Sequence, residues 1–201
     1  MSHSDSPVLE PGPPLPAAAV APAARRERAV RYELGKGDLV TRLTSAGTGD
    51  TRLGAVALTA WRADPVEDRE GTFVYLEEPA LGRLWSVGAE PIAPADGQAW
   101  CEASATRVRL GRAEHDIEAL LDVWVDPQMP LEFRRVTLIN RAPTERLLRV
   151  TLAADVLLGD PAAHASHPAF SRLFVSMEWD AGSSALLAER TNVESTIGCT
   201  R

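Results

Sequence analysis

Residues 116–125 (DIEALLDVWV) alternate between two phases with a period of two. All the charged residues fall in one phase, and the other phase is entirely apolar: Ile117, Ala119, Leu121, Val123 and Val125. Successive side chains of a β-strand point to opposite faces of the sheet, so a period of two is typical of a strand with one buried face. The pattern therefore predicts that Val123 points into a hydrophobic core.

Residues 146–158 (RLLRVTLAADVLL) show the same alternation. The apolar phase comprises Leu148, Val150, Leu152, Ala154, Val156 and Leu158. A helix is the competing interpretation of a run so rich in Leu and Ala, but Arg149, Thr151 and Asp155 all fall on the opposite face of a strand. We therefore expect a strand and place Val150, like Val123, in the core.

Further short strands are expected along the chain, separated by turns rich in Gly, Pro and Asp. They cover 38–45, 55–61, 72–76, 83–87, 99–110, 131–140 and 170–179. In the sixth, the apolar phase slips between Phe133 and Val136, which predicts a β-bulge. No segment reads clearly as a helix, so the expected fold class is all-β, an antiparallel β-sandwich.

Residues 1–29 differ from the rest of the chain. Six of the 15 prolines fall here, and the remainder is mainly Ala, Ser and charge. Such a segment buries too little apolar surface to offset the entropy lost on ordering. We predict a disordered tail or linker over 1–29 and a sandwich domain over 30–201, and the sequence leaves open whether the sandwich is truncated at its C-terminal end.

Composition excludes several classes of protein. The formal net charge of −7 does not suit a nucleic-acid partner or a polybasic membrane binder. No stretch approaches the roughly 18–20 apolar residues of a membrane span, and acidic residues and prolines around 15–24 argue against a signal peptide. Two cysteines, Cys101 and Cys199, suggest free thiols in a reducing compartment, so we expect a cytoplasmic location.

Several segments, taken together and in order, resemble the N-terminal domain of the family 94 glycoside hydrolases, formerly glycosyltransferase family 36. They are GDLVTRLTSAGTG (37–49), TAWRADPVED (59–68), GTFVYL (71–76), RLWS (83–86), FRRVTLIN (133–140) and HPAFSRLFV (167–175). The family includes cellobiose-type phosphorylases and the C-terminal region of cyclic β-1,2-glucan synthases. The resemblance covers about residues 32–190.

The resemblance implies a galactose mutarotase-like supersandwich that accompanies a helical barrel. In the family the general acid and the phosphate-binding residues lie on that barrel, and this chain stops at Arg201 before any such domain. We therefore expect no catalytic residue, no cofactor and no phosphorolysis by this chain alone. The implied partners are a carbohydrate, such as a β-glucan or oligosaccharide, and a helical-barrel domain or second subunit.

Candidate contact residues fall in two groups. The first is the stretch containing Trp61, Arg62, Asp64 and Asp68, where clustered carboxylates could raise one pKa but where Asp64-Pro65 is also a typical turn. The second is a set of aromatic and loop residues: Trp124, which lies on the polar phase of its strand, and His167 and Phe170.

The segment between Pro161 and Pro168 reads as a loop. It carries His164 and His167, but zinc needs three or four ligands and the nearby sequence adds only Asp160, so we expect no metal site. Phe170 either presents an apolar side chain to a partner or begins the next strand and packs in the core.

Three functions stay open on the sequence. The preferred one is a noncatalytic carbohydrate-binding and scaffolding domain. The others are a free-standing mutarotase-like sugar epimerase, which would need a His and a carboxylate acting on an open sugar ring, and a protein-interaction module without a sugar site.

Overall fold

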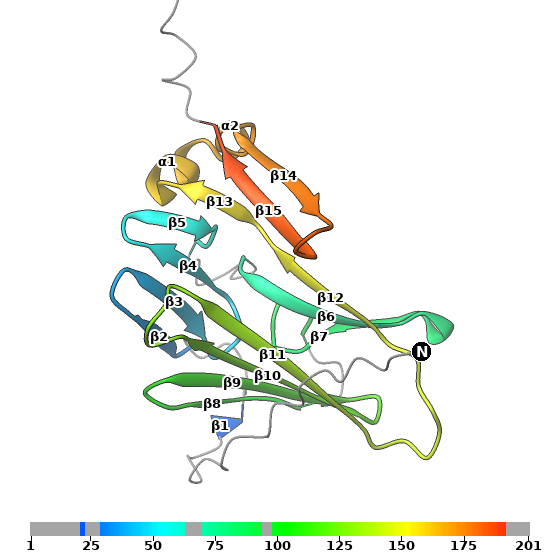
Figure 1. The fold of residues 1–201 in the computed structure, drawn as a ribbon. Coiled ribbons are helices and arrows are strands. Elements are labelled where there is room, and N and C mark those ends of the chain that lie inside the picture. Colours follow the sequence, from blue (N-terminus) through cyan, green and yellow to red (C-terminus); the bar gives the residue numbers. More distant parts are fainter. Residues whose placement is uncertain (1–20, 23–28, 63–69, 94–97, 192–201) are drawn as a thin grey trace, which may run out of the picture.

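The computed structural model describes residues 21–22, 29–62, 70–93 and 98–191. Most of the predicted tail, 1–29, lies outside these residues, although Ala21–Pro22 form a short strand, β1. The described part confirms the predicted class, since it is built mainly from antiparallel strands arranged as a β-sandwich (Figure 1).

One layer of the sandwich is a five-stranded sheet, here sheet A. Its strands are, in spatial order, β1, β8 (Gln98–Ala103), β9 (Arg107–Glu114), β10 (Ile117–Val125) and β11 (Glu132–Asn140). The predicted strand 99–110 is thus two strands joined by a turn. The predicted bulge is absent, because β10 and β11 pair continuously from Ile117 opposite Asn140 to Val125 opposite Glu132.

Two sheets face sheet A across the core (Figure 1). Sheet B runs in the order β13 (Val156–Gly159), β5 (Val56–Thr59), β4 (Gly49–Leu53), β3 (Leu39–Thr44) and β2 (Arg31–Lys36). Sheet C runs in the order β12 (Arg149–Ala154), β6 (Thr72–Glu78) and β7 (Arg83–Ser86). A 3₁₀ turn, η1 (Pro79–Leu81), joins β6 to β7.

The principal core lies between these layers. It contains apolar side chains from all three sheets, among them Leu34 and Leu43 of sheet B and Leu76 and Trp85 of sheet C. From sheet A it takes Val108, Leu110, Ile117, Ala119, Leu121, Val123 and Cys101. The alternation of β10 is therefore confirmed, and Val123 is fully buried.

The same expectation is wrong for β12. Val150 and Leu152 are 48% and 61% exposed. Their phase is nevertheless the predicted one, because Val150 lies opposite Leu76 and Leu152 opposite Val74, and both partners are buried in the core. Cross-strand partners share a face of the sheet, so the apolar side of β12 faces the same way as the core residues of β6. Val150 and Leu152 are exposed because sheet A does not cover them.

The segment predicted as a loop forms two short helices, α1 (Pro161–Ser166) and α2 (Pro168–Arg172). Asp160 caps α1 by accepting hydrogen bonds from the backbone nitrogens of Ala162 and Ala163, and Pro161 occupies the first turn. Gly-Asp-Pro is thus a helix start here, because proline fits the first turn of a helix and aspartate fits the N-cap. A hairpin of β14 (Val175–Asp180) and β15 (Ala185–Arg190) follows.

Candidate functional site

Trp61 lies directly after β5 beside two arginines of neighbouring strands. The guanidinium carbon of Arg31 is 5.4 Å from the centre of the Trp61 ring system, and that of Arg42 is 5.2 Å from it. A hollow of about 300 Å³, here the Trp61 hollow, adjoins them. It is lined by Arg31, Tyr32, Glu33, Arg42 and Trp61.

A buried carboxylate holds Arg42 in place at this hollow. Asp50 is 2% exposed and accepts two hydrogen bonds from Arg42, at 2.6 Å from Nε and 2.5 Å from Nη2. Arg52 contacts the same carboxylate from its Nε at 2.8 Å. A bidentate contact of this kind fixes the plane of the guanidinium, so Arg42 presents a preformed cationic surface beside Trp61.

The adjoining acidic stretch is described only at its ends. Asp64 and Asp68 lie outside the described residues. Arg62 is exposed, and its backbone nitrogen donates to the Glu70 carboxylate at 2.6 Å. Arg62 and Glu70, the described residues on either side of the acidic stretch, are therefore in contact with each other.

Trp124 lies on the outer face of sheet A, as its phase predicts. Its ring stacks on Phe133 of β11, with centroids 5.1 Å apart and an interplanar angle of 12°. The Arg135 guanidinium carbon lies 5.8 Å from the Trp124 ring centre. These neighbours partly bury Trp124, so its ring packs against other side chains and does not stand alone in solvent.

Asp122 anchors the arginines next to Trp124. Its side chain is buried and contacts Arg109, Arg135 and Arg107, with Nε of Arg109 at 2.8 Å from Oδ1. Burial opposes ionisation of Asp122, but the hydrogen bonds and charges of these arginines outweigh it and lower the pKa of the carboxyl. Asp122 therefore stays charged and fixes the positions of these arginines on the outer face of sheet A.

His167 and Phe170 lie in a third place, around α1 and α2. Both are exposed, and Phe170, at 60%, packs edge-to-face on Phe174 with centroids 5.0 Å apart. His164, in contrast, is buried, and its Nδ1 lies 2.5 Å from Ser171 Oγ, tying α1 to α2. In the part of the chain that the structure describes, no cluster of three potential metal ligands occurs.

The structure thus spreads the candidate residues over three regions. Trp61 and Arg62 lie at sheet B, Trp124 on the outer face of sheet A, and His167 and Phe170 at the two helices. The sequence indicated Phe170 in this third region, but not the exposed apolar side chains of the last hairpin that follows it. The large apolar side chains exposed here, named the α2–hairpin surface, are Phe170, Leu173, Met177, Trp179 and Leu186, all at least half exposed. Met177, Trp179 and Leu186 share one face of the hairpin, whereas the exposed Leu187 lies on its other face, opposite Glu178.

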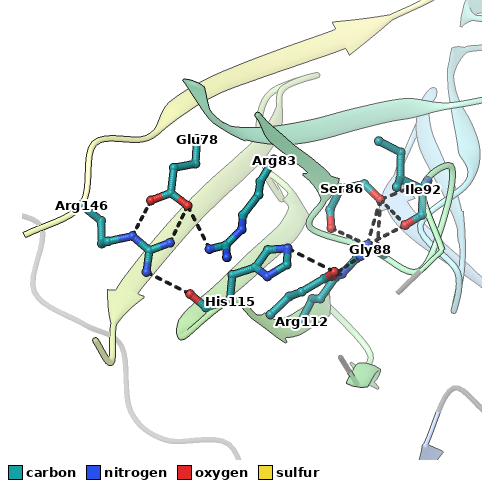
Figure 2. A network of polar contacts seen from close by, with 9 residues as sticks. Glu78, Arg83, Ser86, Gly88, Ile92, Arg112, His115 and Arg146 are labelled. Carbon is teal, nitrogen blue, oxygen red and sulfur yellow. Dashed lines mark hydrogen bonds and ion pairs between the residues drawn. The ribbon is translucent and has the colours of Figure 1, made fainter. Parts of the chain in front are cut away.

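Two buried ionic networks were also missed. Figure 2 shows Glu78 between Arg146 and Arg83, with both Arg146 contacts at 2.5 Å. It also shows Arg112, which is fully buried and donates to the carbonyl oxygens of Ser86, Gly88 and Ile92. Glu78 and Arg112 both lie on the core-facing phase of their strands, and only this phase could have indicated that they are buried. Their charge alone predicts an exposed side chain.

Five carboxylates of the described region are stabilised in their ionised form. Every one with a shifted pKa has it lowered: Glu78, Asp122, Asp126, Glu132 and Asp180. A general acid for cleavage of a glycosidic bond needs the opposite, a raised pKa that keeps the proton available. These groups therefore suit structural roles better than acid catalysis.

Comparison with known proteins now adds to this geometry. A family model described as "Glycosyl hydrolase 94, supersandwich domain" matches residues 24–198. The chain is also 35% identical over 150 residues to the cyclic beta-(1,2)-glucan synthase NdvB of Rhizobium meliloti (strain 1021). That alignment covers 72% of this chain and 5% of the relative, so the chain spans a small part of the protein it resembles. Among the described residues, no helix has the length and apolar character to cross a bilayer.

Proposed function

Because the chain belongs to the glycosyl hydrolase 94 supersandwich family, we propose that it is a noncatalytic module that contacts a carbohydrate and supports a separate catalytic domain. The observation that carries the carbohydrate contact is the Trp61 hollow. It joins an aromatic ring to two arginines, one of them fixed by the buried Asp50.

This combination suits a sugar for two reasons. The C–H faces of a pyranose are apolar enough to pack on an indole ring, and its hydroxyl groups accept hydrogen bonds from guanidinium groups. A ligand site of this kind needs an apolar surface together with a few fixed polar groups that set the orientation of the ligand. The relative is named for cyclic β-1,2-glucan, so β-1,2-linked gluco-oligosaccharides are the class of ligand to test first.

Titration calorimetry of the full chain with these oligosaccharides tests the contact. We expect Trp61→Ala to weaken binding at least about tenfold, the equivalent of 1.4 kcal/mol. Trp179→Ala is the matched control, because Trp179 is 61% exposed on the last hairpin. Equal affinity of Trp61→Ala and the parent chain, or no binding by the parent chain, would refute the proposed contact.

The noncatalytic part of the proposal has its own test. The purified chain, incubated with β-linked glucans and inorganic phosphate, should release no sugar phosphate. Turnover that disappears in Asp64→Asn or Asp68→Asn would contradict this and would make the acidic stretch an active site.

The α2–hairpin surface favours a second role, the docking of a partner domain. Monomeric proteins rarely expose contiguous apolar patches larger than a few hundred Å², and this surface has five large apolar side chains that are at least half exposed, three of them on one face of the last hairpin. We propose that a helical-barrel domain or second subunit covers it. An apolar dye such as anilinonaphthalene sulfonate should bind the isolated chain, and Phe170→Ser should reduce its fluorescence without unfolding the protein.

A further inference from the structure

β11 is the last strand of sheet A, and one of its two edges has no partner strand among the described residues. The turn His115–Asp116 joins β9 to β10, and Glu114 lies opposite Ile117 across it. In such a two-residue hairpin the flanking residues form a hydrogen-bonded pair. Counting outward from that pair, the backbone groups of β11 that face the open edge belong to Glu132, Arg134, Val136, Leu138 and Asn140.

The opposite layer is uncovered on the same side. Val150 and Leu152 of β12 lie on the core side of sheet C, opposite Leu76 and Val74, yet they are about half exposed or more. Among the described residues sheet A ends at β11, and the exposure of Val150 and Leu152 shows that it does not cover them. One additional strand next to β11 would supply both missing features, partners for the open backbone edge and a cover for the apolar side of β12.

We propose that this strand is β11 of a second copy of the chain. The two copies would pair antiparallel about a twofold axis at Val136 and join two A sheets into one continuous sheet. The contact is separate from the carbohydrate contact at Trp61 and from the α2–hairpin surface. It is an isologous interface, in which the same strand is used by both subunits.

The sequence of β11 fits this arrangement. Val136 is the central residue of Glu132–Asn140, so a twofold axis there pairs the whole strand with its copy. The opposed pairs are then Phe133 with Ile139, Arg134 with Leu138, Arg135 with Thr137, and Glu132 with Asn140. No like charges face each other, and the outer face gains an aromatic–aliphatic pair, which is a favourable cross-strand combination.

Neighbouring registers fit less well. An axis at Arg135 places Arg135 directly opposite its own copy, and an axis at Arg134 does the same for that residue. Like charges directly opposed across strands are destabilising. An axis at Thr137 avoids this, but it leaves Glu132 and Phe133 opposite residues beyond the end of the strand.

Cross-linking tests the register. In the proposed pair, a Val136→Cys residue meets its own copy with about 5.5 Å between Cα atoms, within the range of a disulfide. We expect mild oxidation of the full chain to give a covalent dimer on a non-reducing gel. Thr137→Cys is the matched control, because its two copies would lie about 8 Å apart, and the parent chain controls for Cys101 and Cys199. Cross-linking of Thr137→Cys and not of Val136→Cys would overturn the register.

Charge substitutions at the exposed Thr137 test the contact without a cross-link. Thr137→Arg places an arginine opposite Arg135 twice in the twofold pair, and Thr137→Glu places a glutamate there twice. In analytical ultracentrifugation at low salt, we expect the dimer of Thr137→Arg to be at least about tenfold weaker than that of the parent chain, and the dimer of Thr137→Glu to be tighter. A parent chain that stays monomeric at every concentration, or equal constants for the two variants, would overturn the proposal.

Discussion

β10 and β12 carry the same alternating pattern and end in opposite environments. Val123 on β10 is fully buried, whereas Val150 on β12 is 48% exposed although it lies opposite the buried Leu76. β10 is an interior strand of sheet A and faces the other layer over its length, while β12 is the edge of sheet C. The comparison shows that alternation specifies which side of a strand is apolar, and that only the opposite layer specifies whether that side is covered.

The sharpest way to break the comparison is to place a charge at both positions. Val123→Asp should lower the free energy of unfolding by about 4–5 kcal/mol, because it buries an unpaired carboxylate. Val150→Asp should cost less than about 1 kcal/mol in the monomer, because its carboxylate can reach water. Urea denaturation at low protein concentration measures both. Similar losses for the two variants would mean that β12 is covered in solution.

Buried and exposed ion pairs should also differ in how much they contribute to the free energy of unfolding. Arg112 is fully buried against Glu114, whereas Arg149 of β12 pairs with Glu77 at the surface. Arg112→Met should cost about 3–5 kcal/mol, because it leaves the buried Glu114 without its arginine partner. Arg149→Met should cost less than about 0.5 kcal/mol. Equal costs in chemical denaturation would contradict the burial of Arg112.

Acid should lower the free energy of unfolding through two carboxyls of sheet A, Glu132 and Asp122. Burial raises the pKa of Glu132, but Arg134 and the hydroxyl groups of Thr41 and Thr51 outweigh it, and the pKa of this carboxyl lies below its usual 4.5. The pKa of Asp122 likewise lies below 3.8. As the pH falls, these two carboxyls are protonated in the unfolded chain at a higher pH than in the folded chain. Their contribution to the free energy of unfolding is therefore complete above their usual pKa values and is lost as the pH falls below them.

Unfolding experiments between pH 7 and pH 3 measure this dependence. Glu132→Gln removes one of the two groups, so its stability should fall less steeply in acid than that of the parent chain. Glu77→Gln is the control, since Glu77 pairs at the surface with Arg149. A parent chain whose stability is flat down to pH 3 would contradict the lowered pKa values of both carboxylates.

A small effect is also expected at the α2–hairpin surface. Phe170→Ser should change the free energy of unfolding by less than about 1 kcal/mol, because the side chain is 60% exposed. Phe73→Ser, at a buried phenylalanine of β6, should cost about 3–5 kcal/mol. Thermal denaturation of the pair compares them directly, and a chain that unfolds on Phe170→Ser would place this residue in a core.

Several residues of the candidate site could be predicted from the sequence, but the residues that lie beside them in space could not. The phase of β10 placed Trp124 on the outer face, and the motif around Trp61 marked a region that holds a hollow. The approach of Arg31 and Arg42 to Trp61 could not be predicted, because it depends on the pairing of β2 with β3 and on the anchoring of Arg42 by Asp50. The same holds for Glu132, which accepts a hydrogen bond from Thr41 of the opposite layer at 2.6 Å.

The sequence by itself determined the all-β class, the phase of β10 and β12, and the resemblance to the family, because each rests on residues close together in the chain. It misjudged Gly159-Asp160-Pro161, since these residues suit a turn and a helix start equally well. Tertiary structure decided that Asp160 caps α1, that Arg112 is buried and that Val150 is not. Burial is a property of two layers, and a local pattern describes only one of them.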